Sequence, residues 1–170
     1  ILEDLAEQTG ETCNLGVLEG NKVLLVDRVE THLALRIHSE VGTRLDFHTS
    51  AIGKMIVSHL PKERRHRLIT SRPLKRFTPF SKTTEPELEE EFSEIRRRGY
   101  SIANQGTMLG IFGIAMPIHD PKGRILAGLA CQAPLMRMDI EEGEKVFLPA
   151  LKDATQRLQE LIAEDFANIP

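Results

Sequence analysis

Tryptophan is absent from the 170-residue sequence and tyrosine occurs once, at Tyr100, so that aromatic residues make up 5% of the chain. Hydrophobic residues nevertheless amount to 41%, a value typical of a globular protein that buries a core, and the length fits one domain. An excess of basic residues is also missing, since the net charge is −3. The basic runs 62–67 and 96–98 lie in predicted helices beside acidic residues and are interpreted as solvated faces. These features argue against direct contact with DNA or RNA.

Catalytic and metal-binding motifs are missing as well. The six histidines are scattered without an HExxH pattern, and the chain contains no GxSxG, no P-loop and no Cys-His arrangement. The sequence therefore predicts no metal site, no cofactor and no enzyme activity. A small enzyme on a sensor-like scaffold is the weaker alternative, because acidic residues concentrate on segments patterned as exposed helix faces.

Disulfide and membrane signals are equally scarce. The two cysteines, Cys13 and Cys131, lie in apolar runs without a CxxC pattern, which indicates buried, reduced thiols in a cytosolic protein. No apolar run is long enough to cross a bilayer, and the first residues lack a signal-peptide pattern. We therefore expect a cytoplasmic protein without membrane contact.

Apolar periodicity and turn residues give the order of the expected elements. Turns at 19–21 and 120–123 each separate two short apolar runs, which predicts two β-hairpins. The expected elements, in chain order, are a helix over 1–10, strands over 12–18, 22–29 and 33–38, helices over 50–60, 61–70 and 86–98, strands over 100–104, 111–118 and 124–132, and a helix over 140–166. This order predicts an α+β fold with a mainly antiparallel sheet flanked by helices, as in GAF and PAS sensor domains.

Four ordered stretches, at 9–30, 35–61, 95–106 and 113–134, together resemble the effector-binding domain of the IclR family of bacterial transcriptional regulators. The resemblance covers nearly the whole chain. It implies that residues 1–10 are the end of a linker helix and that residues 11–170 are a GAF-like effector-binding domain. It also implies an N-terminal winged helix-turn-helix domain, absent from this sequence, through which alone the protein would contact operator DNA. The expected assembly is a homodimer or homotetramer.

The first candidate site is the predicted helix start within HTSAIGKM at 48–55. Thr49 or Ser50 is a suitable N-cap, and the amides that follow lack intrahelical partners, so this helix end suits a carboxylate or phosphate. An ordinary capped helix, with a glycine tolerated for packing, explains the same residues equally well. The family resemblance implies effector contact at Ala51 and Ile52, with Gly53 beside them.

The second candidate site is the hairpin of residues 110–132, whose two strands each carry small side chains on one face. A ligand would fit over this face, but a closely packed helix would fill it too and is the more common arrangement. The family resemblance places the ligand here, and it implies further pocket positions around the loop at Gly42 and in the strand after Gly99. The matching residues are Ile37, Leu45, Ala103, Ile111, Gly113, Ala130 and Gln132.

The sequence departs from the family pattern at four positions. An acidic residue is usual at Ala103, a larger residue at Gly113, and serines at Ala130 and Gln132. Fewer groups remain to bind hydroxyls, so we expect a roomier, less acidic pocket whose main polar anchors are Gln132 and the helix amides. The expected effector is a small organic acid, with aromatic acids preferred to polyhydroxy acids. The alternatives are a GAF-type sensor domain of a signalling enzyme and an oligomerisation module with a collapsed pocket.

Overall fold

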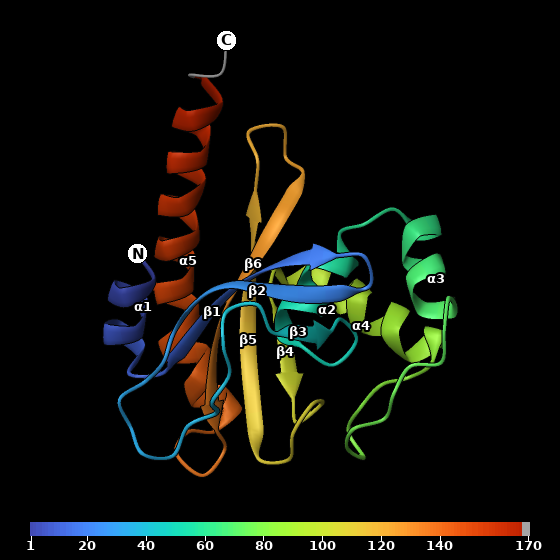
Figure 1. The fold of residues 1–170 in the computed structure, drawn as a ribbon, viewed down its shortest axis with the longest axis horizontal. Helices are drawn as coiled ribbons and strands as arrows, with labels where there is room; N and C mark the ends of the chain where they lie inside the picture. Colours follow the sequence, from blue (N-terminus) through green and yellow to red (C-terminus); the bar gives the residue numbers. More distant parts are fainter. Residues whose placement is uncertain (168–170) are drawn as a thin grey trace.

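The computed structural model describes residues 1–167, which form a six-stranded antiparallel sheet with helices on both faces (Figure 1). The strand order is β3-β2-β1-β6-β5-β4. The helices are α1 (Leu2–Thr9), α2 (Ala51–Ser58), α3 (Lys62–Thr70), α4 (Glu85–Arg98) and α5 (Ile140–Ala167). The strands are β1 (Thr12–Glu19), β2 (Lys22–Val29), β3 (Arg44–Asp46), β4 (Ser101–Asn104), β5 (Ile111–His119) and β6 (Ile125–Pro134). The predicted α+β class with an antiparallel sheet is confirmed.

The hairpins predicted from turn residues form the centre of the sheet. Asp120 closes the β5–β6 turn by accepting hydrogen bonds from the amides of Lys122 and Arg124 through Oδ1, each at 2.9 Å. Gly123 completes this turn with a φ of 76°, a value that L-residues with a side chain rarely adopt. The turn sets the register in which Ala115 lies opposite Ala130.

One face of the sheet packs against α1 and α5, which lie side by side in Figure 1. Its buried side chains include Leu5, Phe112, Phe147 and Leu151. Both cysteines lie on this side, fully buried and not joined by a disulfide, with their Sγ atoms within hydrogen-bond distance at 3.5 Å. Burial raises the pKa of the Cys131 thiol well above its usual range. Both sulfurs pack as core atoms, since both side chains are fully buried.

The opposite face packs against α2 and α4 and contains the second core, which includes Phe47, Met55 and Phe92. Helix α4 begins with a capping box between Thr84 and Glu87, the residue pattern that satisfies two backbone amides at a helix start. Lys54 of α2 joins this helix to α4 and β4, as described below. This face positions the candidate site.

The prediction of a strand over residues 33–38 is wrong. These residues belong to a loop that joins β2 to β3, and the third strand is Arg44–Asp46, which pairs with the free edge of β2. Side chains bind the carbonyls of the loop in place of a strand ladder: Arg36 donates to the Leu33 oxygen and Arg137 to the Leu35 oxygen. The apolar alternation of the segment therefore produces exposed leucines at 33 and 35, which are 44% and 52% exposed.

Candidate functional site

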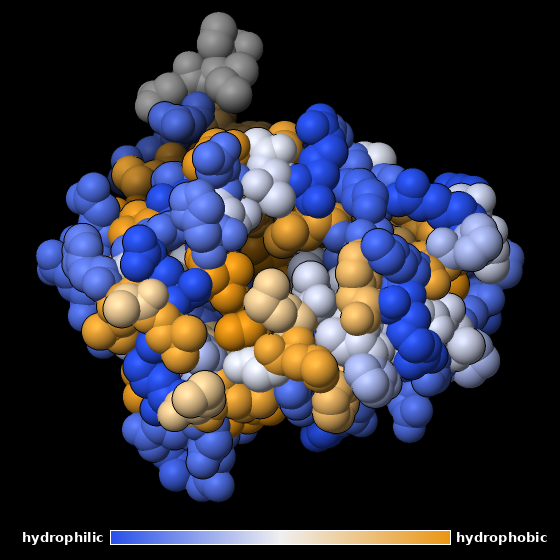
Figure 2. Space-filling model, turned by 60° about the horizontal axis from the view of Figure 1, so that its bottom comes forward, coloured by the Kyte–Doolittle hydropathy of each residue, from blue (hydrophilic) through white to orange (hydrophobic). Residues whose placement is uncertain are grey.

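A cavity of about 260 Å³ lies between the second face of the sheet and the N-terminus of α2. All six strands contribute to its wall, and the loops at 37–39 and 106–108 cover it. The face that Figure 2 brings forward is hollowed near its centre, with hydrophobic side chains gathered around the hollow. A concave, largely apolar site of this kind suits a small ligand.

Nine of the ten residues proposed from the sequence line this cavity. They are Ile37, Leu45, Ala51, Ile52, Ala103, Ile111, Gly113, Ala130 and Gln132. Gly53 does not line it. An added Cβ at Gly53 would stand 2.4 Å from the Phe47 Cα, so this glycine lets the start of α2 pack against the preceding backbone.

The two interpretations of the small-residue face each hold for part of it. Ile52 covers Gly128, where an added Cβ would lie 3.0 Å from the Ile52 Cγ2 atom, so this glycine accommodates a closely packed helix. Gly113 instead lines the cavity, and an added Cβ there would meet its neighbours at 3.5 Å or more. The described residues thus retain an open cavity rather than a collapsed one.

The start of α2 presents backbone amides to the cavity. The Ser50 Oγ atom caps the helix by accepting a hydrogen bond from the Gly53 amide at 3.0 Å. The amides of Ala51 and Ile52 have no hydrogen-bond partner among residues 1–167. Because such amides and the helix dipole favour negative charge, this end of the cavity suits a carboxylate.

Lys54 fixes the position of α2 against its neighbours. Its ammonium group donates to Glu91 Oε1 on α4 at 2.5 Å and to the Ile102 carbonyl on β4 at 2.8 Å. Burial lowers the pKa of Lys54. For Glu91, burial opposes ionisation, but Lys54 and Lys82 outweigh it, and the pKa of this carboxyl is lowered. The ion pair therefore joins the helix that carries the amides to two other elements.

Arg28 is the one lining residue, among those described, whose side chain carries a full charge at neutral pH. Its side chain is only 5% exposed, and its guanidinium donates to Asn14 Oδ1 at 2.6 Å, to Glu30 Oε1 and to the Ile37 carbonyl. Partial burial acts to raise the pKa of Glu30, but hydrogen bonds from Arg36, the Ser39 amide and Arg28 lower it to about 2. Glu30 thus stays ionised at neutral pH.

Arg28 and Asn14 were not among the residues proposed from the sequence. In a regular strand Leu25 and Arg28 would face opposite sides of the sheet. A bulge in the β1–β2 pairing leaves Val26 without a partner, because Gly16 pairs with Leu25 while Leu15 pairs with Asp27. The extra residue turns Arg28 to the same side as Leu25, into the cavity. No residue in the run 22–29 marks this bulge, so alternation alone gave no signal for it.

Other sequence features have structural roles. His48 is buried, donates through Nε2 to the Lys75 carbonyl at 2.9 Å and lies outside this cavity. In the basic runs, Arg65 pairs with Glu89 and Arg96 donates to the Ser58 carbonyl. Among residues 1–167, no group of three or more His, Cys, Asp or Glu residues is arranged to hold a metal ion. Within the same residues, no helix combines the length and apolar character that crossing a membrane requires.

The chain is similar to known proteins over almost its whole length. A family model described as "Bacterial transcriptional regulator IclR C-terminal" matches residues 1–160. A probable transcriptional regulator from Cupriavidus necator, SauR, is 35% identical over 164 residues, which are 96% of this chain and 65% of that protein. The chain thus spans slightly less than two thirds of this relative's length.

Two solved structures with bound aromatic acids share the fold. One is the inducer-binding domain of a double mutant of the PobR transcription factor from Acinetobacter, in complex with 3-hydroxybenzoic acid; the similarity has a TM-score of 0.86 at 28% identity and covers 95% of this chain and 94% of that one. The other is an IclR homolog from Microbacterium hydrocarbonoxydans complexed with 4-hydroxybenzoate, with a TM-score of 0.83, 29% identity and coverage of 94% and 63%.

Proposed function

The chain belongs to the IclR family of bacterial transcriptional regulators, as its C-terminal, effector-binding domain, and from this premise we propose that it binds a small organic acid which modulates operator binding by the full-length regulator. The single observation that carries the proposal is the cavity against the open amides of Ala51 and Ile52. A regulator responds to a ligand only when the ligand favours one arrangement of the protein over another. The cavity supplies a place for such a ligand.

The lining residues favour aromatic acids over polyhydroxy acids. Leu25, Leu45 and Ile111 supply an apolar wall, while Ala103 and Ala130 supply no hydroxyl or carboxylate to bind sugar hydroxyls. Burying an unpaired hydroxyl costs free energy, so a polyhydroxy acid gains little here. The hydroxybenzoates in the two related structures support the same class of ligand.

Calorimetric titration tests this preference directly. We expect benzoate or a hydroxybenzoate to bind with a measurable heat and gluconate, a polyhydroxy acid, to bind at least tenfold more weakly, which corresponds to about 1.4 kcal/mol. Binding of gluconate in preference to all of the aromatic acids would contradict the proposed ligand class. The control is a gluconate titration of protein already saturated with the aromatic acid. Gluconate binding that persists in this titration lies outside the cavity.

Operator binding and assembly complete the proposal. The part of the C. necator relative that the chain does not cover is where we place the DNA-binding domain, since the matching family model describes a C-terminal part. We further propose that the protein is cytoplasmic and acts as a homodimer or homotetramer. Sedimentation measurements with and without the bound acid would distinguish these two assemblies from a monomer.

A further inference from the structure

The wall opposite the α2 amides carries a second group of polar side chains. Ala51 lies over Gly113 on β5 and Ile52 over Gly128 on β6, whereas Asn14 lies on β1, two strands from Gly113. Two strand spacings amount to roughly 10 Å. Asn14 and Arg28, which lies opposite Asn14 on β2, therefore meet a ligand at the end of the cavity away from Ala51.

Hydrogen-bond counting shows what this end offers. A guanidinium has five N–H donors. Four bonds of Arg28 go to Glu30, Asn14 and the Ile37 carbonyl, which leaves one Nη1 hydrogen without a partner among the described residues. Because Asn14 Oδ1 accepts from Arg28, the Asn14 amide presents its NH₂ group as the remaining polar atom. Both residues thus have N–H donors available for a ligand.

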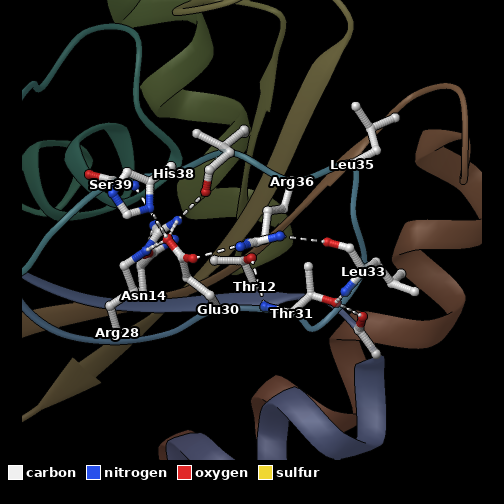
Figure 3. Close-up of polar contacts among 12 residues, drawn as sticks. Thr12, Asn14, Arg28, Glu30, Thr31, Leu33, Leu35, Arg36, His38 and Ser39 are labelled. Atoms are coloured by element: carbon white, nitrogen blue, oxygen red, sulfur yellow. Dashed lines mark hydrogen bonds and ion pairs between the residues drawn. The ribbon is translucent and has the colours of Figure 1, made fainter.

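The same guanidinium holds the loop that covers the cavity. Figure 3 shows Arg28 and Asn14 beside Glu30, whose carboxylate also binds Arg36, His38 and the Ser39 amide. His38 and Ser39 line the cavity, as does Ile37, whose carbonyl accepts from Arg28. A ligand oxygen at Arg28 would therefore lie next to the group that orders residues 36–39.

We propose that Asn14 and Arg28 form a second anchor of the effector site, which takes an acceptor oxygen at the far end of the ligand and thereby orders the covering loop. The inference rests on the proposed function and narrows it. The ligand is an acid with an apolar middle and a second acceptor, such as a hydroxyl or a second carboxylate, remote from the first. A simple monofunctional acid satisfies only the α2 amides.

Matched ligands test the anchor. We expect the native chain to bind 3- or 4-hydroxybenzoate about tenfold more tightly than benzoate, the effect of one hydrogen bond to a charged group. Asn14→Ala should remove this preference by weakening the hydroxybenzoate alone, and Arg28→Gln should do the same. Arg36→Gln is the control, because Arg36 binds the same Glu30 carboxylate without lining the cavity.

The outcomes separate the anchor from the proposed function. Equal binding of benzoate and both hydroxybenzoates leaves the aromatic-acid site in place and overturns the anchor, as does a full preference in Asn14→Ala. Binding of none of the three acids contradicts the proposed ligand class instead. Hydrogen exchange of residues 32–42 gives an independent readout: the hydroxybenzoate should slow it in the native chain and in Arg36→Gln but not in Arg28→Gln. Equal slowing by benzoate would overturn the coupling to the loop.

Discussion

Two glycines on neighbouring strands differ in what a side chain would meet. At Gly113 an added Cβ would contact the Cys131 carbonyl oxygen at 3.5 Å and the Ala51 Cβ at 3.7 Å, which are ordinary contacts. At Gly128 it would approach Ile52 to 3.0 Å, with the Ile52 Cα only 3.4 Å away. The first glycine therefore keeps space open for a ligand, whereas the second lets α2 approach the sheet.

This difference predicts opposite effects of two substitutions. Gly113→Val places two methyl groups at the cavity wall and should reduce aromatic-acid affinity at least tenfold with little change in stability. Gly128→Ala should cost about 1–3 kcal/mol of unfolding free energy through overpacking against Ile52. Urea denaturation and calorimetry measure the two effects, and each variant serves as the control for the other. A Gly113→Val protein that binds the acid normally would contradict the assignment of the cavity.

At the scale of elements, the position of α2 depends on one buried ion pair. Lys54 and Glu91 have side chains only 7% and 11% exposed, and Lys82 is the second cation of Glu91, at 3.1 Å. Removing one member of such a pair leaves the other charge buried without its main partner. Since α2 carries the amides proposed to bind the ligand, the pair supports the site without lining it.

We predict that Lys54→Met lowers the unfolding free energy by about 3 kcal/mol at pH 7. The lowered pKa of Glu91 adds stability above its unfolded pKa of 4.5, and this contribution is lost as the pH falls through the lowered folded value. In the variant, burial should raise the pKa of Glu91, so acid relieves the uncompensated charge. The stability gap should therefore narrow between pH 7 and pH 4. A gap that widens in urea titrations at the lower pH would refute this role, and Lys54→Met/Glu91→Leu should recover most of the loss.

The elements also show what the sequence could and could not predict. Hairpin turns, helix caps and the small-residue face are local signals, and they pointed to the start of α2 and to the β5–β6 hairpin. The individual residues came from the family resemblance, and nine of those ten line one cavity. The strand expected over 33–38 does not form. Its apolar alternation is a local pattern, and the free edge of β2 pairs with Arg44–Asp46 instead. Arg28 was not predicted as a site residue, because a single bulge moves the side chain of every later residue in the strand to the other face of the sheet. Both errors arise from pairing between strands, which side-chain order alone does not encode.

At the scale of the whole molecule, the sheet separates the ligand cavity from α1 and α5. Asn14 faces the cavity, while the adjacent Cys13 belongs to the core on the opposite face of the sheet. The Cys13 Sγ atom lies 3.9 Å from the Thr9 Oγ1 atom of α1. A shift of β1 on ligand binding would therefore reach α1 through one strand. This arrangement suits a domain that passes a signal from one face to the other, as the proposed function requires.

Ligand binding to the folded domain should also stabilise it as a whole. At a ligand concentration 100 times the dissociation constant, binding to the native state alone adds about 2.7 kcal/mol, which corresponds to a rise of roughly 5–10 °C in the unfolding temperature of a domain of this size. We expect a hydroxybenzoate to produce this rise in the native chain and in Arg36→Gln, but not in Gly113→Val at the same concentration. Differential scanning calorimetry measures all three. An equal rise in Gly113→Val would place the binding site outside the cavity, because the valine side chain would occupy the space that the ligand needs there.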